Sequence, residues 1–455
     1  MKLTVKEKVI VALLGVAVAL GLTALVLALA QVASILLPAD TKFGIVFDAG
    51  SSHTSLFVYR WPADKENDTG VVSQALTCRV KGPGISSYAS DPAQAGESLR
   101  GCLQEALAAV PEAQQQQTPL FLGATAGMRL LSQKNSSQAG HIFAAVSDVL
   151  GLAPVAFWGA ELLAGQDEGA LGWITINYVL GLLVKYSFSG EWIRPPEGTL
   201  VGALDMGGAS TQITFVPEGP IRDQSTQASF RLYGFEHRVY THSYLCYGRD
   251  QALTRLLARL VTAPLVRHPC YHGGYVDTLS LAPLYESPCV QAAPRPDFPP
   301  SLPVEGTGNP GACVSAIREL FNFSSCRGRQ DCAFNGVYQP PVRGQFYVEA
   351  SWPGQQPWLR DYCASGLYLL TLLLEGYGFS EETWPSIAFR KQAGGADIGW
   401  TLGYMLNLTN MVPAEAPAPG RAQSQAVWVA GVVLVALTLA AVLAVAVAQL
   451  LWRRD

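Results

Sequence analysis

The chain has 455 residues, which leaves room for two or three domains, and 49% of them are hydrophobic whereas 15% are charged. The formal net charge is -4, and the sequence has no Lys/Arg-rich run or zinc-spaced cysteine set, so it does not predict binding to nucleic acid. A polyanionic ligand would therefore be held by backbone amides and a metal ion rather than by bulk charge.

Two long uncharged segments, 9–37 and 427–452, lie near the ends of the chain. Each exceeds the ~20 apolar residues that cross a bilayer. Lysines precede the first segment and two arginines follow the second, which predicts cytoplasmic termini and an extracellular region between the segments. A signal peptide cleaved after 28–30 is the alternative for the first, but its apolar run exceeds the ~7 to 15 residues of a signal core. A lipid-anchor signal is the alternative for the second, and the trailing arginines favour a stop-transfer end.

All nine cysteines lie between Cys78 and Cys363, in the segment expected outside the cell. This distribution indicates disulfides formed in an oxidising compartment. Cys78 and Cys102 bracket a loop and are expected to pair, and Cys326 and Cys332 are close enough for a local bridge. Four sequons for N-glycosylation agree with this compartment: Asn67, Asn135, Asn322 and Asn407.

The first element expected after the apolar segment is a β-hairpin over 42–61. Two apolar strands flank the turn D-A-G-S-S-H-T-S, and Asp48 ends the first strand. A turn of glycine and small polar residues brings backbone N–H groups close to an anion. The turn is therefore expected to bind phosphate through Gly50, Ser51, Ser52, His53 and Thr54.

A short apolar strand over 118–124 ends in T-A-G-M-R, which places Thr125 at a strand-to-helix turn. A hydroxyl there can reach a phosphate or a metal-bound water, although such a residue is more often a helix cap. Residues 161–182 are expected to form a helix with an early Q-D-E-G interruption that contains Glu168. Because glutamates on helices are usually solvated, the pattern alone assigns Glu168 no role.

The segment 202–215, G-A-L-D-M-G-G-A-S-T-Q-I-T-F, repeats the first hairpin. Asp205 aligns with Asp48, and small residues again form the turn. The duplication predicts two similar lobes that face one cleft, with a polyphosphate and its metal between them. The second turn is expected to bind phosphate through Gly207, Gly208, Ala209 and Ser210.

The second half of the chain carries fewer signals. A helix is expected over 251–261, followed over 263–341 by an irregular insertion clamped by disulfides. Helix-like apolar patterns return at 367–374 and 397–406, and the stretch A-E-A-P-A-P indicates a stalk before the second apolar segment.

The two turns resemble the phosphate-binding hairpins of the actin, hexokinase and heat-shock ATPase superfold. Their amino-acid sequences resemble the conserved regions of the ecto-nucleoside triphosphate diphosphohydrolases, or apyrases. Two further stretches match this family, L-G-A-T-A-G-M-R-L-L at 122–131 and G-A-E-L-L-A-G-Q-D-E-G-A-L-G-W-I-T-I-N-Y at 159–178. The resemblance covers nearly the whole chain. It implies an α/β fold of two RNase H-like lobes, and hydrolysis of nucleoside tri- and diphosphates outside the cell with Ca²⁺ or Mg²⁺.

The resemblance also implies roles for individual residues. Glu168 would be the general base that deprotonates water positioned by Ser210 and Gln212, with Thr125 beside them. Asp48 and Asp205 would hold the ion through water. Arg249, Asp250 and Tyr362 would bind the nucleoside, and a surface ion pair is the alternative for the first two. The cysteines expected in disulfides are Cys78, Cys102, Cys246, Cys289, Cys270, Cys313, Cys326 and Cys332, which leaves Cys363 unpaired.

One stretch departs from the family. After Tyr347 the family continues with an aromatic-rich segment and a further cysteine, whereas here V-E-A-S-W-P-G follows at once, as in an alternatively spliced product. The family stacks the nucleobase between aromatic rings, one of them from this segment, so Tyr362 remains as a candidate. The missing cysteine would be the partner of Cys363.

Two other functions stay open. The superfold also contains phosphotransferases such as sugar kinases. A truncated, non-enzymatic form would bind nucleotide weakly or only assemble with a full-length chain through its membrane helices, which would also support a homo-oligomer. The expected parts are tails at 1–8 and 453–455, membrane helices at 9–37 and 427–452, lobe I at 38–170 with a return at 391–413, lobe II at 171–390, and a stalk at 414–426.

Overall fold

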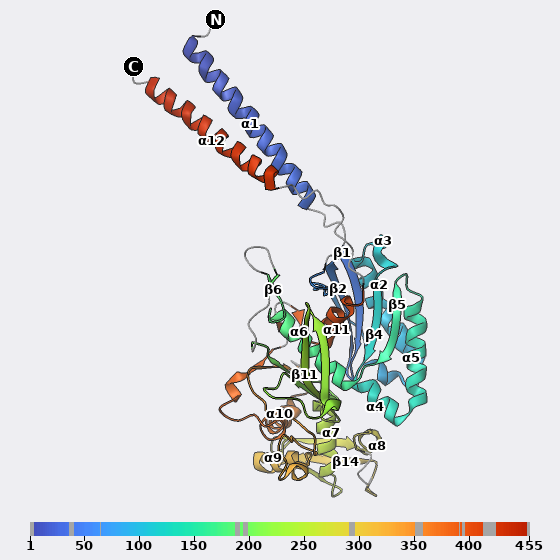
Figure 1. Cartoon of the computed structure of the whole chain (residues 1–455). Helices are drawn as coiled ribbons and strands as arrows, with labels where there is room; N and C mark the ends of the chain where they lie inside the picture. Colours follow the sequence, from blue (N-terminus) through green and yellow to red (C-terminus); the bar gives the residue numbers. More distant parts are fainter. Residues whose placement is uncertain are drawn as a thin grey trace. The chain divides into compact units, whose positions relative to one another are not determined.

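The computed structural model describes residues 4–35, 41–63, 65–186, 192–193, 199–290, 296–350, 358–390, 392–393, 396–412 and 425–452. The chain divides into two compact units (Figure 1). The terminal unit contains Met1–Thr41, Pro62–Asp64 and Glu415–Asp455, and the larger unit contains Lys42–Trp61 and Lys65–Ala414.

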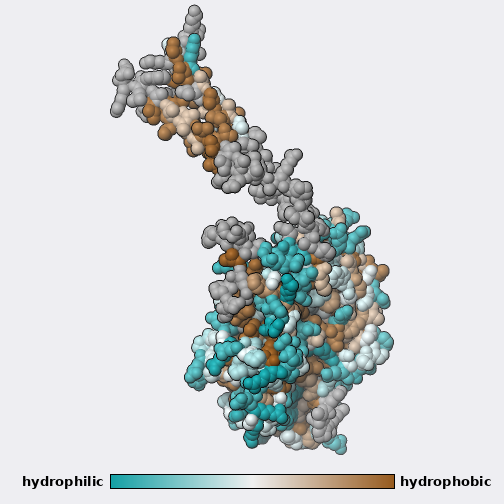
Figure 2. Space-filling view, viewed as in Figure 1, coloured by the Kyte–Doolittle hydropathy of each residue, from teal (hydrophilic) through white to brown (hydrophobic). Residues whose placement is uncertain are grey.

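The terminal unit consists of two long helices, α1 (Val5–Ile35) and α12 (Gln425–Trp452). Figure 2 shows mainly hydrophobic surface over their described parts. Within the described residues, one helical stretch, Glu7–Ala24 of α1, is long and apolar enough to cross a membrane, and the apolar part of α12, Val432–Val447, is shorter. The expectation of two membrane-spanning helices is thus supported for the first only. The end of the first expected span, 36–37, lies outside the described residues.

The first lobe of the larger unit is built on a five-stranded sheet with the order β3-β2-β1-β4-β5. The strands β1, β4 and β5 run parallel, and β2 pairs antiparallel with β3. The strands are β1 (Thr41–Ala49), β2 (Thr54–Pro62), β3 (Ser73–Arg79), β4 (Pro119–Ala124) and β5 (Ala156–Leu162). One face packs in a buried cluster with α2 (Pro92–Ala109), α4 (Ala126–Lys134) and α5 (Ser136–Gly151).

The second lobe is built on a six-stranded sheet with the order β10-β11-β9-β8-β15-β16. As in the first lobe, the first hairpin strand, β8, has its antiparallel partner β9 on one side and a parallel strand, β15, on the other. The strands are β8 (Gly202–Met206), β9 (Ser210–Phe215), β10 (Gln227–Leu232), β11 (Phe235–Leu245), β15 (Phe346–Ala350) and β16 (Ile387–Phe389). The expected α/β fold with two similar lobes is confirmed.

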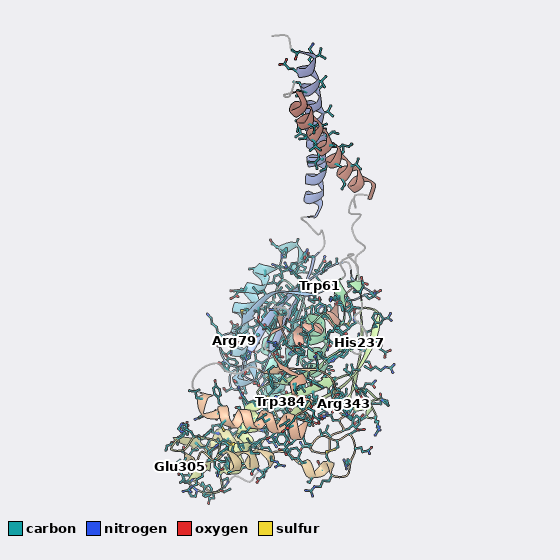
Figure 3. The ribbon with its side chains drawn as sticks, turned by 90° about the vertical axis from the view of Figure 1, so that its left-hand side faces the viewer. Trp61, Arg79, His237, Glu305, Arg343 and Trp384 are labelled. Atoms are coloured by element: carbon teal, nitrogen blue, oxygen red, sulfur yellow. A yellow bond between two sulfur atoms is a disulfide. The ribbon has the colours of Figure 1, made fainter. Side chains whose placement is uncertain are left out.

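A cluster of buried hydrophobic side chains contains residues from both sheets. Two helices contribute to it, α6 (Gly165–Val179) and α11 (Trp400–Thr409). Their buried side chains share this hydrophobic cluster with Trp61 of β2, which Figure 3 labels, and with Val239 of β11. A hydrogen bond of 2.8 Å joins the hydroxyls of Tyr59 and Thr401, so α11, the last helix of the larger unit, packs against the first hairpin. The N–H of Gly403 in α11 donates to the hydroxyl of Thr175 in α6 at 2.8 Å, so α11 also connects the helix that carries Glu168 to the first hairpin.

The segment after the second hairpin is more regular than expected. It contains α7 (Arg249–Leu260), α8 (Leu281–Glu286), α9 (Pro310–Arg318) and a three-stranded sheet of β12 (Val266–His268), β14 (Ser301–Gly306) and β13 (Val276–Ser280). The expectation that the insertion over 263–341 is irregular is therefore wrong, whereas its expected disulfide clamp is confirmed by Cys270–Cys313 and Cys326–Cys332. Its strands are three to six residues long and pair across many residues of chain, so local patterns did not reveal them.

Three expected helices have different bounds. Glu161 and Leu162 pair with Gly123 and Ala124 as the end of β5, so α6 begins only at Gly165. The helix expected over 367–374 begins earlier, as α10 (Tyr362–Thr371), and continues as a π-helical turn, Leu372–Gly376. The helix expected over 397–406 begins at Trp400 because Ala396 and Asp397 form a short strand. Besides several 3-10 turns, the described residues also form α3 (Glu112–Gln115), β6 (Lys185–Tyr186), β7 (Trp192–Ile193), β17 (Gln392–Ala393) and β18 (Ala396–Asp397).

Four disulfides cross-link the larger unit. They are Cys78–Cys102, Cys246–Cys289, Cys270–Cys313 and Cys326–Cys332, which are the eight cysteines expected to pair. Cys363 is free and exposed. Of the four sequon asparagines, Asn67, Asn135 and Asn322 are exposed, whereas Asn407 is half-buried on α11. Glycosylation of all four stays a prediction, with Asn407 the least accessible.

Candidate active site

The two glycine-containing turns lie close together in the larger unit. A side-chain carbon added to Gly208 would lie 2.8 Å from Ser51 Oγ, so the turn after β8 nearly touches the turn after β1. A carbon added to Gly127 at the start of α4 would lie 2.7 Å from Ser51 Cα. The approach to backbone leaves no room for a side chain at Gly127, whereas at Gly208 the nearest atoms are the ends of the Asp250 and Ser51 side chains. The duplicated pattern thus corresponds to two turns at one place.

A cavity of about 350 Å³ opens at these turns. Ser51 lines it from the first turn, and Gly208 and Ala209 line it from the second. Farther along, Lys134 and Glu286 border the cavity and form an ion pair of 3.4 Å. The cavity therefore brings together residues of both expected phosphate turns.

The second turn is fastened to the start of α7 by backbone hydrogen bonds. The N–H of Arg249 donates to the carbonyl of Gly207 at 3.0 Å, and the N–H of Gln251 donates to that of Gly208, also at 3.0 Å. The N–H of Cys246 donates to the carbonyl of Ala209 at 2.8 Å. Arg249 and Asp250, the residues expected to bind the nucleoside, are thus held directly beside the expected phosphate turn.

Glu168 lies in the first turn of α6 and is buried, with 8% of its surface exposed. Its Oε2 accepts a hydrogen bond from Gln212 Nε2 at 3.0 Å and pairs with the guanidinium of Arg129. The same Gln212 amide lies 2.8 Å from Ser210 Oγ and 3.0 Å from Ser243 Oγ. The structure therefore brings together three of the four residues expected at the catalytic centre.

Thr125, the fourth, lies where α4 begins and is buried, with 4% of its surface exposed. It occupies the capping position, yet its side chain makes no capping hydrogen bond. Its backbone N–H donates to the carbonyl of Ala49, 3.1 Å away, at the end of β1. The helix-cap interpretation of this hydroxyl therefore has no contact to support it.

Burial dominates the electrostatics of the acidic residues. It raises the pKa of Glu168, which the nearby charges of Asp205 and Asp48 raise further and the Arg129 guanidinium opposes. Burial also raises the pKa of Asp48, to about 6. The pKa of Asp205 lies well above its ordinary value because of burial and then the charges of Glu349 and Asp48. The three carboxyl groups therefore lie close enough for the charge of one to raise the pKa of another.

The acidic residues fit a hard divalent cation held through water. Asp48 Oδ1 is buried without a hydrogen bond of normal geometry to the described residues, although the Trp400 side chain lies near enough to lower the pKa of this carboxyl. Within the same described parts of the chain, no group of three or more His, Cys, Asp or Glu side chains is arranged to hold a metal ion directly. Carboxylate oxygens suit Ca²⁺ and Mg²⁺, and Mg²⁺ in particular keeps much of its hydration shell.

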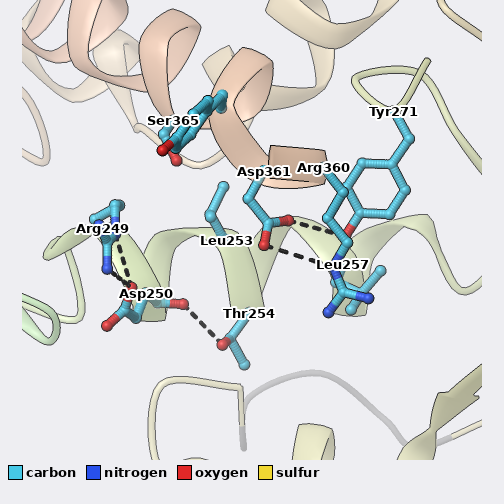
Figure 4. Close-up of a pocket in the computed structure, with 10 residues that line it drawn as sticks. Arg249, Asp250, Leu253, Thr254, Leu257, Tyr271, Arg360, Asp361 and Ser365 are labelled. Atoms are coloured by element: carbon cyan, nitrogen blue, oxygen red, sulfur yellow. Dashed lines mark hydrogen bonds and ion pairs between the residues drawn. The ribbon is translucent and has the colours of Figure 1, made fainter. Parts of the chain in front are cut away.

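A second cavity, of about 270 Å³, lies between α7 and the start of α10 (Figure 4). Arg249, Asp250 and Tyr362 line it, together with Arg360 and Tyr271. Arg249 and Asp250 form an ion pair of 2.7 Å, which is the alternative expected for these two residues. Asp250 also borders the cavity at the two expected phosphate turns. The nucleoside candidates therefore share one pocket that adjoins the two expected phosphate turns through Asp250.

Sequence reasoning missed two residues of the centre. Arg129 ends the matched stretch T-A-G-M-R, and its place just after an expected strand, near Thr125, could have indicated that it belongs to the site. Ser243 lies on β11, where it pairs in register with Gln212 of β9. No local pattern marks Ser243, because only the pairing of β9 with β11 brings it to the centre.

A protein-family model described as GDA1/CD39 (nucleoside phosphatase) matches residues 34–353 and 346–421. The chain belongs to the GDA1/CD39 nucleoside phosphatase family. Ectonucleoside triphosphate diphosphohydrolase 8 from Bos taurus is 68% identical and that from Homo sapiens 67% identical, each over all of this chain and all of the relative. These matches confirm the resemblance to the apyrases, including the eighth, cell-surface member, and the prediction that this GDA1/CD39 chain is an enzyme of that class.

The fold of this GDA1/CD39 chain is also found in a solved structure. A nucleoside triphosphate hydrolase from Neospora caninum matches it with a TM-score of 0.55 and 14% identity, over 86% of this chain and 95% of that chain. The match to the human relative extends over 495 positions, 40 more than the 455 residues of the chain, so the relative has residues that this chain lacks. The two family matches overlap at 346–353, beside the departure noted after Tyr347.

Proposed function

We propose that the chain hydrolyses nucleoside tri- and diphosphates outside the cell, with Ca²⁺ or Mg²⁺. The observation that carries this proposal is the buried Glu168, hydrogen-bonded to Gln212 beside Ser210, at the second of two facing turns. Family membership supports the nucleotide substrate, because the similar proteins are ectonucleoside triphosphate diphosphohydrolases.

The phosphate chain would bind between the two turns. Backbone N–H groups and hydroxyls of 50–54 and 207–210 would donate to phosphate oxygens, as small residues in tight turns commonly do. Asp48 and Asp205 would hold the divalent ion through water, and the ion would neutralise charge on the phosphate oxygens. The nucleoside would lie in the pocket lined by Arg249, Asp250 and Tyr362, which adjoins the turns.

Glu168 would act as the general base. A carboxylate can take a proton from an attacking water only if it is ionised and within hydrogen-bond reach. The Arg129 guanidinium favours the ionised form, and the amide of Gln212 orients the Oε2 atom beside Ser210. Water held by Ser210 and Gln212 would attack the terminal phosphorus, Glu168 would accept its proton, and phosphate would leave the nucleotide.

The decisive test is Glu168→Gln, which keeps the size of the side chain and removes the base. Loss of a general base costs ~10² to 10⁴ in rate, so the rate of phosphate release from ATP should fall by at least about 100-fold. Glu161→Gln, an exposed glutamate on β5, is the matched control and should keep its activity. Full activity of Glu168→Gln would overturn the proposed mechanism, and phosphate transfer that requires an added acceptor would favour a kinase.

Membrane topology follows from the two apolar ends. We infer that α1 and α12 both span the membrane and that the larger unit is extracellular, which the disulfides and sequons support. Each lobe would be RNase H-like, with lobe I over 38–170 and 391–413 and lobe II over 171–390. Terminal tags should react with antibody only after permeabilisation, and glycosidase should lower the apparent mass. Staining of either tag on intact cells would contradict this topology.

A non-enzymatic form is the second candidate. The observation in its favour is the departure after Tyr347, together with the 40 additional positions of the match to the human relative. Such a form would reach the surface, bind nucleotide weakly and release no phosphate. The same phosphate assay on intact cells distinguishes it from an active enzyme.

A further inference from the structure

Ser243 lies at the centre of the candidate site, and the proposed function gives it no role. It is half-buried on β11, where it pairs in register with Gln212 of β9. Its Oγ lies 3.0 Å from Gln212 Nε2 and 3.4 Å from Arg129 Nη1. These two donors are the groups that contact Oε2 of Glu168. The hydroxyl of Ser243 therefore links the two side chains that hold the expected base.

Four side chains form a closed ring in which donors and acceptors alternate. Glu168 and Ser243 accept, whereas the Gln212 amide and the Arg129 guanidinium each donate to both of them. A hydroxyl oxygen has two lone pairs, so Ser243 can accept both hydrogen bonds at once. The four residues come from α6, β11, β9 and α4, which are distant in sequence. In a buried network of this kind, each link fixes the geometry of the others.

The Gln212 amide lies close to more acceptors than it has protons. Its Nε2 is 3.0 Å from Glu168 Oε2, 3.0 Å from Ser243 Oγ and 2.8 Å from Ser210 Oγ. An amide nitrogen carries two hydrogens, and a carboxylate is the strongest of these acceptors. One hydrogen therefore goes to Glu168, and the two serines share the other. Without Ser243, the second hydrogen would bind Ser210 alone and occupy the hydroxyl that is expected to hold water.

The other end of this amide needs a donor. Gln212 is only 1% exposed, and its Oε1 has no hydrogen-bond partner among the described residues. Buried polar atoms are normally satisfied, and water often supplies the missing hydrogen bond. Because the amide is planar, the contacts that fix Nε2 also fix the direction of Oε1. Ser243 thus helps to set where a water molecule can donate to Gln212.

The start of α6 packs directly against this pair of groups. A side-chain carbon added to Gly165 would collide with Ser243 and with the guanidinium of Arg129. Gly165 is the first residue of α6, and Glu168 lies in the same turn. The base, the hydroxyl and the guanidinium are therefore held together by close packing as well as by hydrogen bonds.

We propose that Ser243 is a positioning residue for hydrolysis and that it acts through Gln212. It holds Nε2 of the amide toward Glu168, and it thereby aims Oε1 at the attacking water. This inference rests on the proposed function, in which Gln212 and Ser210 hold that water. Because Ser243 needs no contact with the nucleotide, its loss slows the chemical step and leaves nucleotide binding unchanged.

Ser243→Ala tests the proposal in the purified full chain in detergent micelles, with ATP as substrate and saturating Ca²⁺. Misplacing the amide should lower kcat by about 10- to 100-fold. The KM for ATP should change by less than about twofold, because the lost interaction acts in the transition state. Ser229→Ala removes an exposed hydroxyl from the adjacent strand β10 and should leave both constants unchanged. A thermal melt of each variant shows that it is folded.

A double-mutant cycle shows whether Ser243 acts through Gln212. When the amide is already absent in Gln212→Ala, adding Ser243→Ala should lower kcat by less than about twofold. Single turnovers with enzyme in excess measure these slow variants. An equal loss in both backgrounds would overturn the proposal, because Ser243 would then support the fold independently of the amide. A raised KM with unchanged kcat in Ser243→Ala would also overturn it.

The outcomes separate this inference from the proposed function. If Glu168→Gln is inactive while Ser243→Ala has the kcat of the unsubstituted chain, the inference about Ser243 is wrong and the role of Glu168 stands. If Glu168→Gln is fully active, the proposed base is wrong and the inference fails with it. If the unsubstituted chain releases no phosphate, both proposals fail.

Discussion

Replacing Arg129 by glutamine should move the pH dependence of hydrolysis to higher pH. Arg129 Nη2 contacts Glu168 and lies 3.4 Å from Ser210 Oγ, and its Nη1 lies 3.4 Å from Ser243 Oγ. The paired side chains are only 12% and 10% exposed, so solvent screens the interaction weakly. The substitution removes the positive charge that favours the ionised base and leaves Gln212 as its remaining donor.

The magnitude follows from this burial. Removing an adjacent opposite charge raises the pKa of a carboxyl group by about 1 to 3 units. A base with a raised pKa is more protonated at neutral pH, so kcat/KM there should fall by about 10- to 1,000-fold and recover as the pH rises. Breaking a buried pair by removing one partner also costs about 3 to 5 kcal/mol of folding free energy, and the hydrogen bond from Gln212 favours the lower end.

The assay is phosphate release from ATP with saturating Ca²⁺, measured from pH 5.5 to the alkaline limit of stability. The matched control is Arg259→Gln, which breaks an exposed pair with Glu319 and should cost about 1 kcal/mol or less without moving the profile. An activity loss in Arg129→Gln that is equal at every pH would refute the reasoning, because Arg129 would then act by binding phosphate or by supporting the fold.

Three further predictions use other parts of the structure. Burial raises the pKa of Asp48 to about 6, so between pH 4 and 6 the folded chain keeps a proton that the unfolded chain has lost. Its melting temperature in EDTA should therefore fall as pH rises through this window, and a rise would contradict the burial. Cys363, free and exposed, should react with maleimide without reduction, whereas Cys363→Ser should not. Tyr362→Ala should weaken ATP binding by ~1 to 3 kcal/mol if the ring stacks on the base, and should leave hydrolysis of inorganic triphosphate unchanged.

Local patterns in the sequence were enough to place the two hairpins. Each turn is bounded by apolar strands, and both the strand period and the glycine positions are visible within about 15 residues. The pattern alone assigned no role to Glu168, which only its resemblance to the apyrases singled out. In the structure its partners Gln212 and Arg129 lie 44 and 39 residues away, so no local window contains the three together.

The remaining differences arise from pairings over long sequence distances. Residues 161–162 have a helical pattern but end β5, because hydrogen bonding to β4 outweighs local propensity. The strand β14 pairs with β12 and β13 across loops that separate them in sequence, which explains why this insertion looked irregular. Ser243 reaches the centre by its register with Gln212. Each case depends on which strands meet, and composition does not encode that choice locally.

The strand β15 shows how the chain can depart from its family and retain the phosphate turns. A strand between two parallel neighbours needs apolar side chains on its core face, and Phe346 and Val348 meet this need, since both are buried. Tyr347 lies on the other face of the sheet, where it packs with Ala203 against the buried apolar cluster that contains Ile176 of α6. The sheet is therefore complete on either side of β15, and the turn after β8 keeps its hydrogen bonds to α7. Glu168, Gln212 and Arg129 all lie outside 346–353, so the elements that bring these three side chains together do not include the departure.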